Sequence, residues 1–397
     1  MKFAYFGMPH IGGTYTVFKM LRAGLREHGI EVRWIGVGPG APDLDIEWRD
    51  EMDCGAMVDP EGRLDAEGQA AALVAEIRGG GYDGVFVNVL ANQVQTNIAR
   101  YLPRDVLRIM IVHNMTPGTY AAARSIRDHV HATVAVSERC RRDLTGRHGF
   151  AADRTSAIAN AVSPFAHIAD TRRRPGAAPR LLYLGRIEDS SKGVFWLPSL
   201  MSRLPADVQL SVAGDGPDLP ALKDRFRGAG DRVRFLGKVR PQNVPAQLLG
   251  HDVFVMPSRY EGYPMSLIEA MSAGCVPVAS HIDGVTDTIV DHGRDGLLFP
   301  VGDWRQAAGQ IEWLGSRPDI LRAMSSAART KAASAFGVDG MARSYATLIG
   351  RLAHRTPSIA EPLDLGAWRL PAGLRPGLRT FLPRGVKNWL RVARERI

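Results

Sequence analysis

Two glutamates separated by seven residues are the strongest candidates for chemistry in this sequence. Residues 261–270 read EGYPMSLIEA and directly follow a predicted strand at 253–258. Pro264 suits the first turn of a helix, where its missing N–H needs no partner, so Glu261 would precede that helix and Glu269 would lie beyond its first turn. Helix starts attract phosphate, and the carboxylates could accept hydrogen bonds from sugar-like hydroxyls. The alternative is an ordinary helix surface with two solvated glutamates.

Basic residues and glycines follow other predicted strands of the same half of the chain. Arg186 comes directly after the strand at 181–185, and Lys192 opens the next helix. Residues 213–217 read AGDGP and residues 235–239 read FLGKV, so successive strand ends bring glycines and cations to one rim. Two cations at such a rim could bind a diphosphate and neutralise the charge that develops when it leaves.

The first half offers a glycine turn between a strand at 2–6 and a helix at 14–28. Residues 8–14 read MPHIGGT, so the amides of Gly12 and Gly13 could approach a phosphate. Neither the GxGxxG pattern of dinucleotide-binding folds nor the GKS/T of a P-loop is present. The sequence therefore lacks the core residues of a dinucleotide-binding site and of a P-loop.

Short apolar segments alternate with helical ones along the chain, which is typical of βα units in a parallel sheet. The expected strands are 2–6, 31–36, 84–88, 107–112, 132–136 and 156–158, then 181–185, 208–213, 232–236, 252–256, 276–279 and 297–299. We therefore predict an α/β protein with two doubly wound domains, 1–166 and 181–337, joined by a linker at 167–180. Such sheets bind ligands beyond the carboxyl ends of their strands, so two facing sheets would hold a ligand in the cleft between them.

The net charge of +9 is concentrated at the end of the chain, where eight basic residues from Arg369 onward face only Glu395. Within 386–394, apolar and basic residues fall on different faces of a helical pattern. This pattern is typical of an interfacial helix drawn to anionic lipid, which would make 374–397 a peripheral membrane contact. The alternative is a helix that packs its apolar face back onto the protein. No nucleic-acid-binding motif accompanies the charge, so we expect no nucleic-acid partner.

The apolar runs, the first residues and the cysteines of the sequence indicate the cellular compartment and the cofactors to expect. No apolar run approaches the ~18 residues of a spanning helix, and the first residues read as a strand rather than as a signal peptide. Cys54, Cys140 and Cys275 lie far apart, which predicts neither a zinc site nor disulfides. We expect a cytoplasmic protein, in which tail contact would be with the inner face of the membrane. Residues 43–45 read DLD but lack supporting ligands, so we interpret this DxD as a chance match and expect no metal or other cofactor.

Taken together and in order, these motifs resemble the retaining glycosyltransferases of the GT-B fold, glycosyltransferase family four. Further matches are VHN at 112–114, VS at 136–137, NAV at 160–162, AGCVPV at 273–278 and DHGRDGLL at 291–298. The chain departs from the family at 282–287, where IDGVTD replaces a segment that is often glycine-rich and contains proline. The resemblance implies two Rossmann-like domains that face an interdomain cleft, the first on the acceptor side and the second for the nucleotide sugar. It also implies a closing helix at 338–354, and it leaves the tail at 355–397 unexplained.

The resemblance also implies an activity: retaining, metal-independent transfer of a sugar from a nucleoside-diphosphate sugar to a hydroxyl of a glycan, a lipid-linked sugar or a small molecule. Its implied catalytic residues are His113, Glu261, Arg186 and Lys192. Arg186 and Lys192 would bind the diphosphate, Glu269 the ribose hydroxyls, and Glu261 the donor sugar. The implied donor contacts also include Gly12, Gly13, Val239, Tyr263, Met265, Ser266 and Leu267.

The motifs also fit two other interpretations. One is a nucleotide-sugar epimerase or a phosphorylase on the same fold, and the other is a non-catalytic nucleotide-sugar-binding protein. No residue stands out as a covalent nucleophile, which favours attack by the acceptor on the face from which the diphosphate departs. The loops at 37–62 and 113–125 are the candidates for acceptor recognition.

Overall fold

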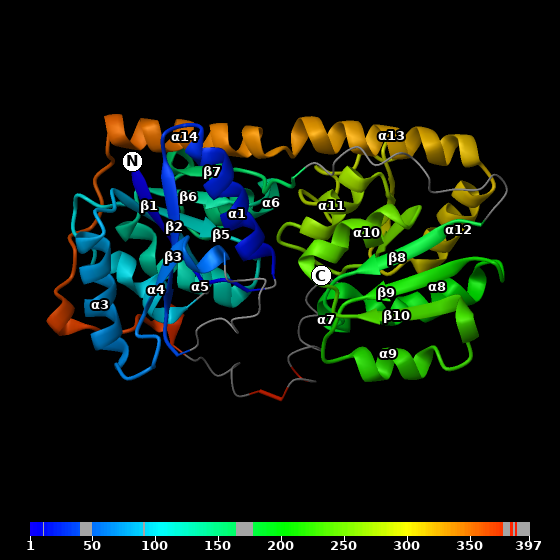
Figure 1. Ribbon diagram of the computed structural model, residues 1–397, viewed down its shortest axis with the longest axis horizontal. Coiled ribbons are helices and arrows are strands. Elements are labelled where there is room, and N and C mark those ends of the chain that lie inside the picture. The colour runs from blue at the N-terminus through cyan, green and yellow to red at the C-terminus, as the bar shows by residue number, and fades with distance from the viewer. Residues whose placement is uncertain are drawn as a thin grey trace. The chain divides into compact units, whose positions relative to one another are not determined.

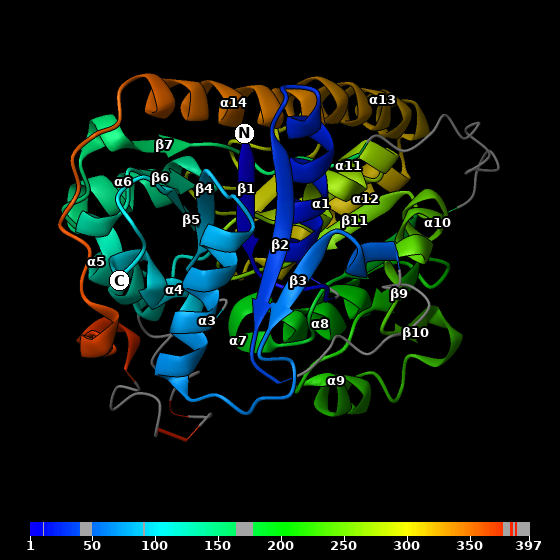
Figure 2. The same ribbon diagram turned by 60° about the vertical axis from the view of Figure 1, so that its left-hand side comes forward.

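The computed structural model describes residues 1–10, 12–39, 50–89, 92–163, 178–375, 382–383 and 386. The chain divides into two compact units, shown in Figures 1 and 2. The N-unit comprises Met1–Ala161 and Val338–Gly377, and the C-unit comprises Val162–Gly337. Residues 167–177 of the predicted linker, the DxD at 43–45 and almost all of the predicted membrane contact at 374–397 lie outside the described residues.

The described part of the N-unit contains one parallel sheet in the order β3-β2-β1-β4-β5-β6-β7. Its strands are β1 (Lys2–Phe6), β2 (Glu31–Val37), β3 (Gly55–Val58), β4 (Gly84–Asn88), β5 (Leu107–Val112), β6 (Ala132–Ala135) and β7 (Thr155–Ala157). β3 was not predicted, because four residues at a sheet edge carry too little periodicity to be recognised. The strand order reverses between β1 and β4, and a ligand site is expected at such a switch point.

Helices cover both faces of this sheet. They are α1 (Gly13–Arg26), α3 (Ala66–Gly79), α4 (Gln93–Asn97), α5 (Pro117–Ile126), α6 (Glu138–Arg147) and α14 (Val338–His354). Strand β1 shows why both faces must be covered, since Ala4 and Phe6 enter the core beneath α3 to α6. Its other side chains, Phe3 and Tyr5, form ring contacts on the face that α1 and α14 cover.

The C-unit contains a second parallel sheet, whose described strands lie in the order β10-β9-β8-β11-β12-β13. They are β8 (Arg180–Leu184), β9 (Gln209–Ala213), β10 (Val233–Gly237), β11 (Val253–Met256), β12 (Val276–His281) and β13 (Leu297–Pro300). The helices are α7 (Asp189–Lys192), α8 (Leu197–Arg203), α9 (Leu219–Arg225), α10 (Val244–Leu249), α11 (Met265–Ala273), α12 (Trp304–Gly315) and α13 (Pro318–Ala335). The strands lie where the apolar runs predicted them, and the predicted doubly wound α/β class is confirmed in both units.

Beyond α14 the chain continues along the N-unit as an irregular segment, residues 355–375, which we call the strap (orange to red in Figures 1 and 2). The amides of Ala360 and Leu363 donate to the carbonyls of Asp128 and Arg100. The Trp368 ring lies 4.6 Å from that of Tyr101, and Leu374 is buried in the core beneath α5. The strap is thus an integral part of the N-unit. No helix in the described ranges combines the length and the apolar character needed to span a bilayer.

Candidate functional site

The predicted cations and glutamates of the C-unit come together at one edge of its sheet. Strands β8 and β11 are neighbours, with Leu181 paired to Val253, although other strands separate them in sequence. The strand order reverses at this pair, and a parallel sheet binds ligands beyond the carboxyl ends of its strands at that point. Arg186 follows β8 and Glu261 follows β11, so both lie at the switch point.

Lys192 and Glu261 form an ion pair in this site. The Lys192 Nζ lies 2.6 Å from the Glu261 Oε1, and the Ser258 hydroxyl donates to the same oxygen at 2.7 Å. Glu261 is only 8 % exposed. Within the described part of the chain the other carboxylate oxygen accepts no hydrogen bond, so it is available to a ligand hydroxyl.

Arg186 lies at the same edge but is held loosely. Its side chain is 65 % exposed, and its Nε lies 3.7 Å from the Glu188 Oε2. An exposed ion pair of this kind contributes at most about 1 kcal/mol. The guanidinium can therefore turn towards an anionic ligand at little energetic cost.

Two glycines allow the strand-end loops to pack backbone against backbone. A Cβ on Gly214, whose φ is +139°, would lie 1.9 Å from the carbonyl oxygen of Gly185, and one on Gly216 would lie 2.3 Å from that of Ile187. No other residue fits either position. The predicted AGDGP turn thus shapes the loop that carries Arg186.

Glu269 is a half-buried carboxylic acid on α11. Among the described residues it has no hydrogen-bond or ion-pair partner, and burial raises its pKa to about 7. An unpaired carboxylate held in this way is unfavourable for folding, which is typical of a group retained for a ligand.

The start of α11 differs in detail from the prediction. Pro264 is the N-cap and the helix begins at Met265, so the proline lies just before the first turn rather than in it. No described side chain caps this helix start, which leaves the amides of Met265 and Ser266 open to a ligand. Leu267 has a different role, because its side chain is fully buried and its N–H donates to the Pro264 carbonyl.

Tyr263 and Val239 lie on the outer part of the core beneath α10 and α11. The Tyr263 hydroxyl is buried without a described partner, and burial raises its pKa. Val239 follows β10, two strands from β8. The structure therefore places Val239 further along the same rim as the other predicted residues.

The N-unit has its own cluster at the carboxyl ends of β1, β4 and β5. The Asn88 side-chain amide donates to the Phe6 carbonyl at 2.7 Å, so its oxygen can accept from the His113 Nε2 at 2.8 Å. Burial lowers the pKa of His113 to about 4, so the ring is neutral at pH 7. With Nε2 protonated, Nδ1 is left as an acceptor for a ligand hydroxyl. Gly12 is the N-cap of α1 and Gly13 is its first residue, in the connection that follows β1.

A pH dependence of stability follows from the state of His113. A histidine with a lowered pKa contributes stability that is fully present above its usual pKa of 6.5 and is lost as the pH falls towards 4. The His113→Gln variant should therefore lose less stability than wild type between pH 7 and 5, by about 2 kcal/mol at pH 5. Between pH 7 and 5, the melting temperature of this variant should fall by about 4–8 °C less than that of wild type.

His131 provides the matched control, because burial lowers its pKa to about 4 as well. It lies at the start of β6, where its Nδ1 accepts from the Arg108 amide. The His131→Gln variant should flatten the pH dependence in the same way. If His113→Gln melts with the full wild-type pH dependence, His113 is not held neutral.

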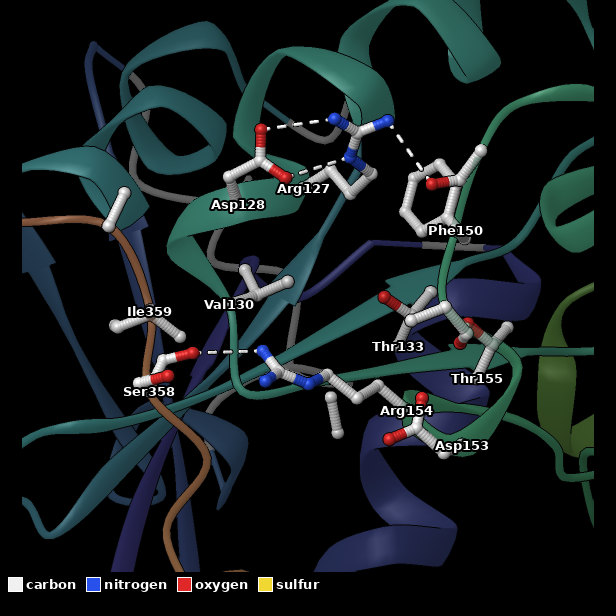
Figure 3. Close-up of a pocket in the computed structure, with 14 residues that line it drawn as sticks. Arg127, Asp128, Val130, Thr133, Phe150, Asp153, Arg154, Thr155, Ser358 and Ile359 are labelled. Carbon is white, nitrogen blue, oxygen red and sulfur yellow. Dashed lines mark hydrogen bonds and ion pairs between the residues drawn. The ribbon is translucent and has the colours of Figure 1, made fainter.

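A cavity of about 530 Å³ lies at the opposite edge of the N-unit sheet, where β6 and β7 begin (Figure 3). Its two arginines already have partners. Arg127 bonds to both carboxylate oxygens of Asp128 at 2.9 and 3.1 Å, and Arg154 donates to the carbonyl of Ser358 in the strap. Because it lies at the amino ends of the strands, this cavity is not the site that the switch point predicts.

The sequence did not point to the residues that hold these groups in place. Asn88 and Ser258 were both missed. Asn88 could have been found as the one polar residue in the apolar strand that reads GVFVN. Ser258 gave no readable signal, although its partner Glu261 is only three residues away.

Comparison with known proteins gives consistent matches over most of the chain. The model described as "Glycosyltransferase Family 4" matches residues 11–164, and that described as "Glycosyl transferases group 1" matches residues 178–317. Alpha-D-kanosaminyltransferase from Streptomyces kanamyceticus is 27 % identical over 246 residues, which are 58 % of this chain and 63 % of that protein. Phosphatidyl-myo-inositol mannosyltransferase from Mycobacterium leprae is 34 % identical over 155 residues, 37 % of this chain and 40 % of that protein.

Both matches thus span less than two thirds of the relative's own length. Among solved structures, Anabaena HepE in complex with UDP and glucose has a similar fold, with a TM-score of 0.71 and 18 % identity. That likeness covers 89 % of this chain and 100 % of HepE.

Proposed function

Because this chain belongs to glycosyltransferase family 4 and has the GT-B fold, we propose that it transfers a sugar from a nucleoside-diphosphate sugar to an acceptor hydroxyl with retention of configuration. The observation that carries the proposal is the cluster of Arg186, Lys192 and Glu261 at the switch point of the C-unit. The relatives named above, a kanosaminyltransferase and a mannosyltransferase, support sugar transfer. The complex of HepE with UDP and glucose supports a nucleotide-sugar donor.

The proposed site suits the charge that this reaction develops. When the bond from the sugar carbon to the diphosphate breaks, negative charge accumulates on the departing oxygen. Fixed cations and open amides aimed at that oxygen stabilise the transition state more than the ground state. Lys192 and the start of α11 would supply these fixed groups, and the exposed Arg186 would turn towards the same oxygen. The free oxygen of Glu261 would hold a hydroxyl of the donor sugar.

The acceptor oxygen would bond to the sugar carbon on the face that the diphosphate leaves. The acceptor's proton would pass to the departing phosphate oxygen, so no covalent enzyme intermediate forms. Neutral His113, with Nδ1 free to accept, is suited to orienting a sugar hydroxyl but not to supplying positive charge. Trapping a glycosyl-enzyme intermediate would overturn this route.

The proposal includes independence from metal ions, because two cations and a helix start would neutralise the leaving group. We expect the transfer rate to change by less than about twofold when EDTA is added, compared with the ~10²–10³-fold losses that follow removal of an essential charge stabiliser. A rate that falls with EDTA and returns with Mg²⁺ would contradict this part of the proposal.

Glu269 should accept hydrogen bonds from ribose hydroxyls, and its raised pKa gives a test. A carboxyl group whose pKa rises on folding contributes stability below its usual pKa of 4.5, and this stability is lost as the pH rises through about 7. The Glu269→Gln variant removes the unfavourable buried charge, so at pH 8 it should be more stable by on the order of 1–3 kcal/mol.

The same variant should bind a nucleoside diphosphate at least about tenfold more weakly, because a hydrogen bond to a charged acceptor is lost. Thermal melts and calorimetric titration at pH 8 measure the two effects. A variant that gains stability but binds the nucleotide normally would remove Glu269 from the site.

The activity itself is tested with a panel of nucleoside-diphosphate sugars. Ligands that raise the melting temperature identify the donor, and release of the nucleoside diphosphate with an acceptor measures transfer. An epimerase would rearrange the donor sugar without an acceptor, and a phosphorylase would need inorganic phosphate. A binding protein would show the thermal shift with no turnover, and any of these three results would replace the proposal.

A further inference from the structure

We propose that Arg259 and Asp189 act together as a clamp that positions Lys192 against Glu261. Neither residue belongs to the motifs that predicted the site. The inference rests on the function proposed above, in which Lys192 and Glu261 bind different parts of one donor. Arg259 and Asp189 are therefore positioning residues, which act through the two charged side chains rather than on the donor itself.

Side-chain and main-chain bonds both join the two halves of the clamp. The Arg259 Nη2 donates to the Asp189 Oδ2 at 3.0 Å, and its Nε donates to the Asp189 carbonyl at 2.9 Å. The Arg259 amide also donates to the carbonyl of Ser191 at 2.8 Å. The side chains are only 13 % and 18 % exposed, so solvent screens this ion pair weakly.

The clamp is itself fixed on both sides. The Asp189 Oδ1 accepts from the Phe195 amide at 2.8 Å, and the Asp189 amide donates to the Asp218 Oδ2 at 2.7 Å. The Arg259 guanidinium lies 4.0 Å from the centre of the Trp196 ring, a favourable cation–π contact. Each partner therefore has a single well-defined orientation.

Helix α7 needs such support, because it contains only the residues Asp189–Lys192. A helix this short is unstable by itself, so the contacts of its first residue decide where its last residue, Lys192, lies. On the facing loop, Arg259 is only two residues from Glu261. The clamp therefore lies beside the Lys192–Glu261 pair and joins the same two segments.

The backbone leaves no room for the two segments to move closer. A Cβ on Gly193 would lie 2.2 Å from the Pro257 carbonyl, and Gly193 has a φ of +60°. The segments are thus in direct contact at one end and held by the clamp at the other. Without the clamp, Lys192 and Glu261 could still bind separate groups, but their separation would no longer be fixed.

The proposal predicts a specific kinetic defect in an Arg259→Gln variant. Transfer requires the diphosphate and the sugar to be held together, and a misplacement of about 1 Å can reduce turnover ~10²-fold. We expect kcat to fall about 100-fold, while the Kd of the nucleoside diphosphate alone changes by less than about threefold, because that ligand does not need Glu261. Arg259→Lys, which keeps the charge but not the forked guanidinium, should recover about tenfold of the lost kcat.

Arg305→Gln is the matched control. Arg305 also stacks on a tryptophan of the C-unit, with its guanidinium 4.4 Å from the Trp304 ring, but it belongs neither to the clamp nor to the site. Its replacement should leave kcat unchanged. If Arg259→Gln lowers only the melting temperature, with the kcat of the folded protein intact, the pair serves stability alone and the proposal is wrong.

Hydrogen exchange tests the clamp without any donor. The amides of Arg259 and Phe195, which bond to Ser191 and Asp189, should exchange at least about tenfold faster in Arg259→Gln than in wild type. Unchanged protection would overturn the clamp whatever the activity. If the wild-type protein shows no transfer activity but the two amides still exchange faster in Arg259→Gln, the proposed function is wrong and the clamp is supported.

Discussion

The Lys192→Met variant is expected to retain about one thousandth or less of the wild-type kcat/KM for sugar transfer. Removing one fixed donor that stabilises a developing negative charge reduces turnover ~10²–10³-fold, and Lys192 carries a full charge. The substitution also leaves the Glu261 carboxylate with Ser258 as its only described partner. Both the diphosphate and the sugar would therefore be held less well. Steady-state kinetics with the identified donor measure the loss.

Lys331→Met is the matched control for this experiment. Lys331 lies in the same unit, 19 % exposed against 26 % for Lys192, and pairs with Asp291 at 2.8 Å. Its replacement should lower the melting temperature without lowering kcat. Similar activity losses in the two variants would show that the effect comes from instability and not from the loss of a cation in the site.

The Arg186→Ala variant is expected to lose about 10³-fold in turnover while its melting temperature stays within about 1 °C of wild type. The separation of the two effects follows from the geometry, since the side chain is 65 % exposed and its nearest carboxylate lies 3.7 Å away. Folding therefore gains almost nothing from Arg186. Kinetics and thermal melts on one preparation measure both quantities.

Arg180, at the other end of strand β8, offers a control. It lies at the amino end of β8, 3.6 Å from Asp252, with its side chain 42 % exposed. Arg180→Ala should leave turnover unchanged, because that end of the strand is remote from the switch point. A near-normal rate in Arg186→Ala would remove Arg186 from the site.

The strands of both sheets, and the sheet edge at which the candidate site lies, could be predicted because short stretches of sequence determine them. Strands buried on both faces appear as continuous apolar runs, such as VFVM at residues 253–256, and the residues after each run must gather at one edge of a parallel sheet. Arg186, Lys192 and Glu261 were predicted to lie at this edge in this way. Strand β3 was missed for the opposite reason, since GAMV at a sheet edge has neither length nor periodicity.

The contacts that hold the site were not predictable, because they join residues far apart in the chain. Arg259 is 70 residues from Asp189, and Asn88 is 25 residues from His113. No local pattern signals such a pair. The strap could not be predicted from the sequence either, because its hydrogen bonds to the N-unit come from the backbone of irregular residues such as Ala360 and Leu363.

The protonation states of the site could not be derived from the sequence either. Glu269 was found from its spacing to Glu261, but its raised pKa arises from burial, which depends on the packing around α11. His113 was expected near the reacting sugar, and the low pKa that makes it a neutral acceptor depends on its enclosure beside Asn88. Chemistry at these positions is set by the fold as much as by residue type.

The most direct test is a crystal structure of the chain with its nucleoside diphosphate bound. We predict diphosphate oxygens within about 3 Å of the Lys192 Nζ and the Arg186 guanidinium, beyond the carboxyl ends of β8 and β11, with the ribose at Glu269. A nucleotide bound elsewhere, for example in the cavity beside Arg154 and the strap, with Lys192 still bonded only to Glu261, would contradict the account.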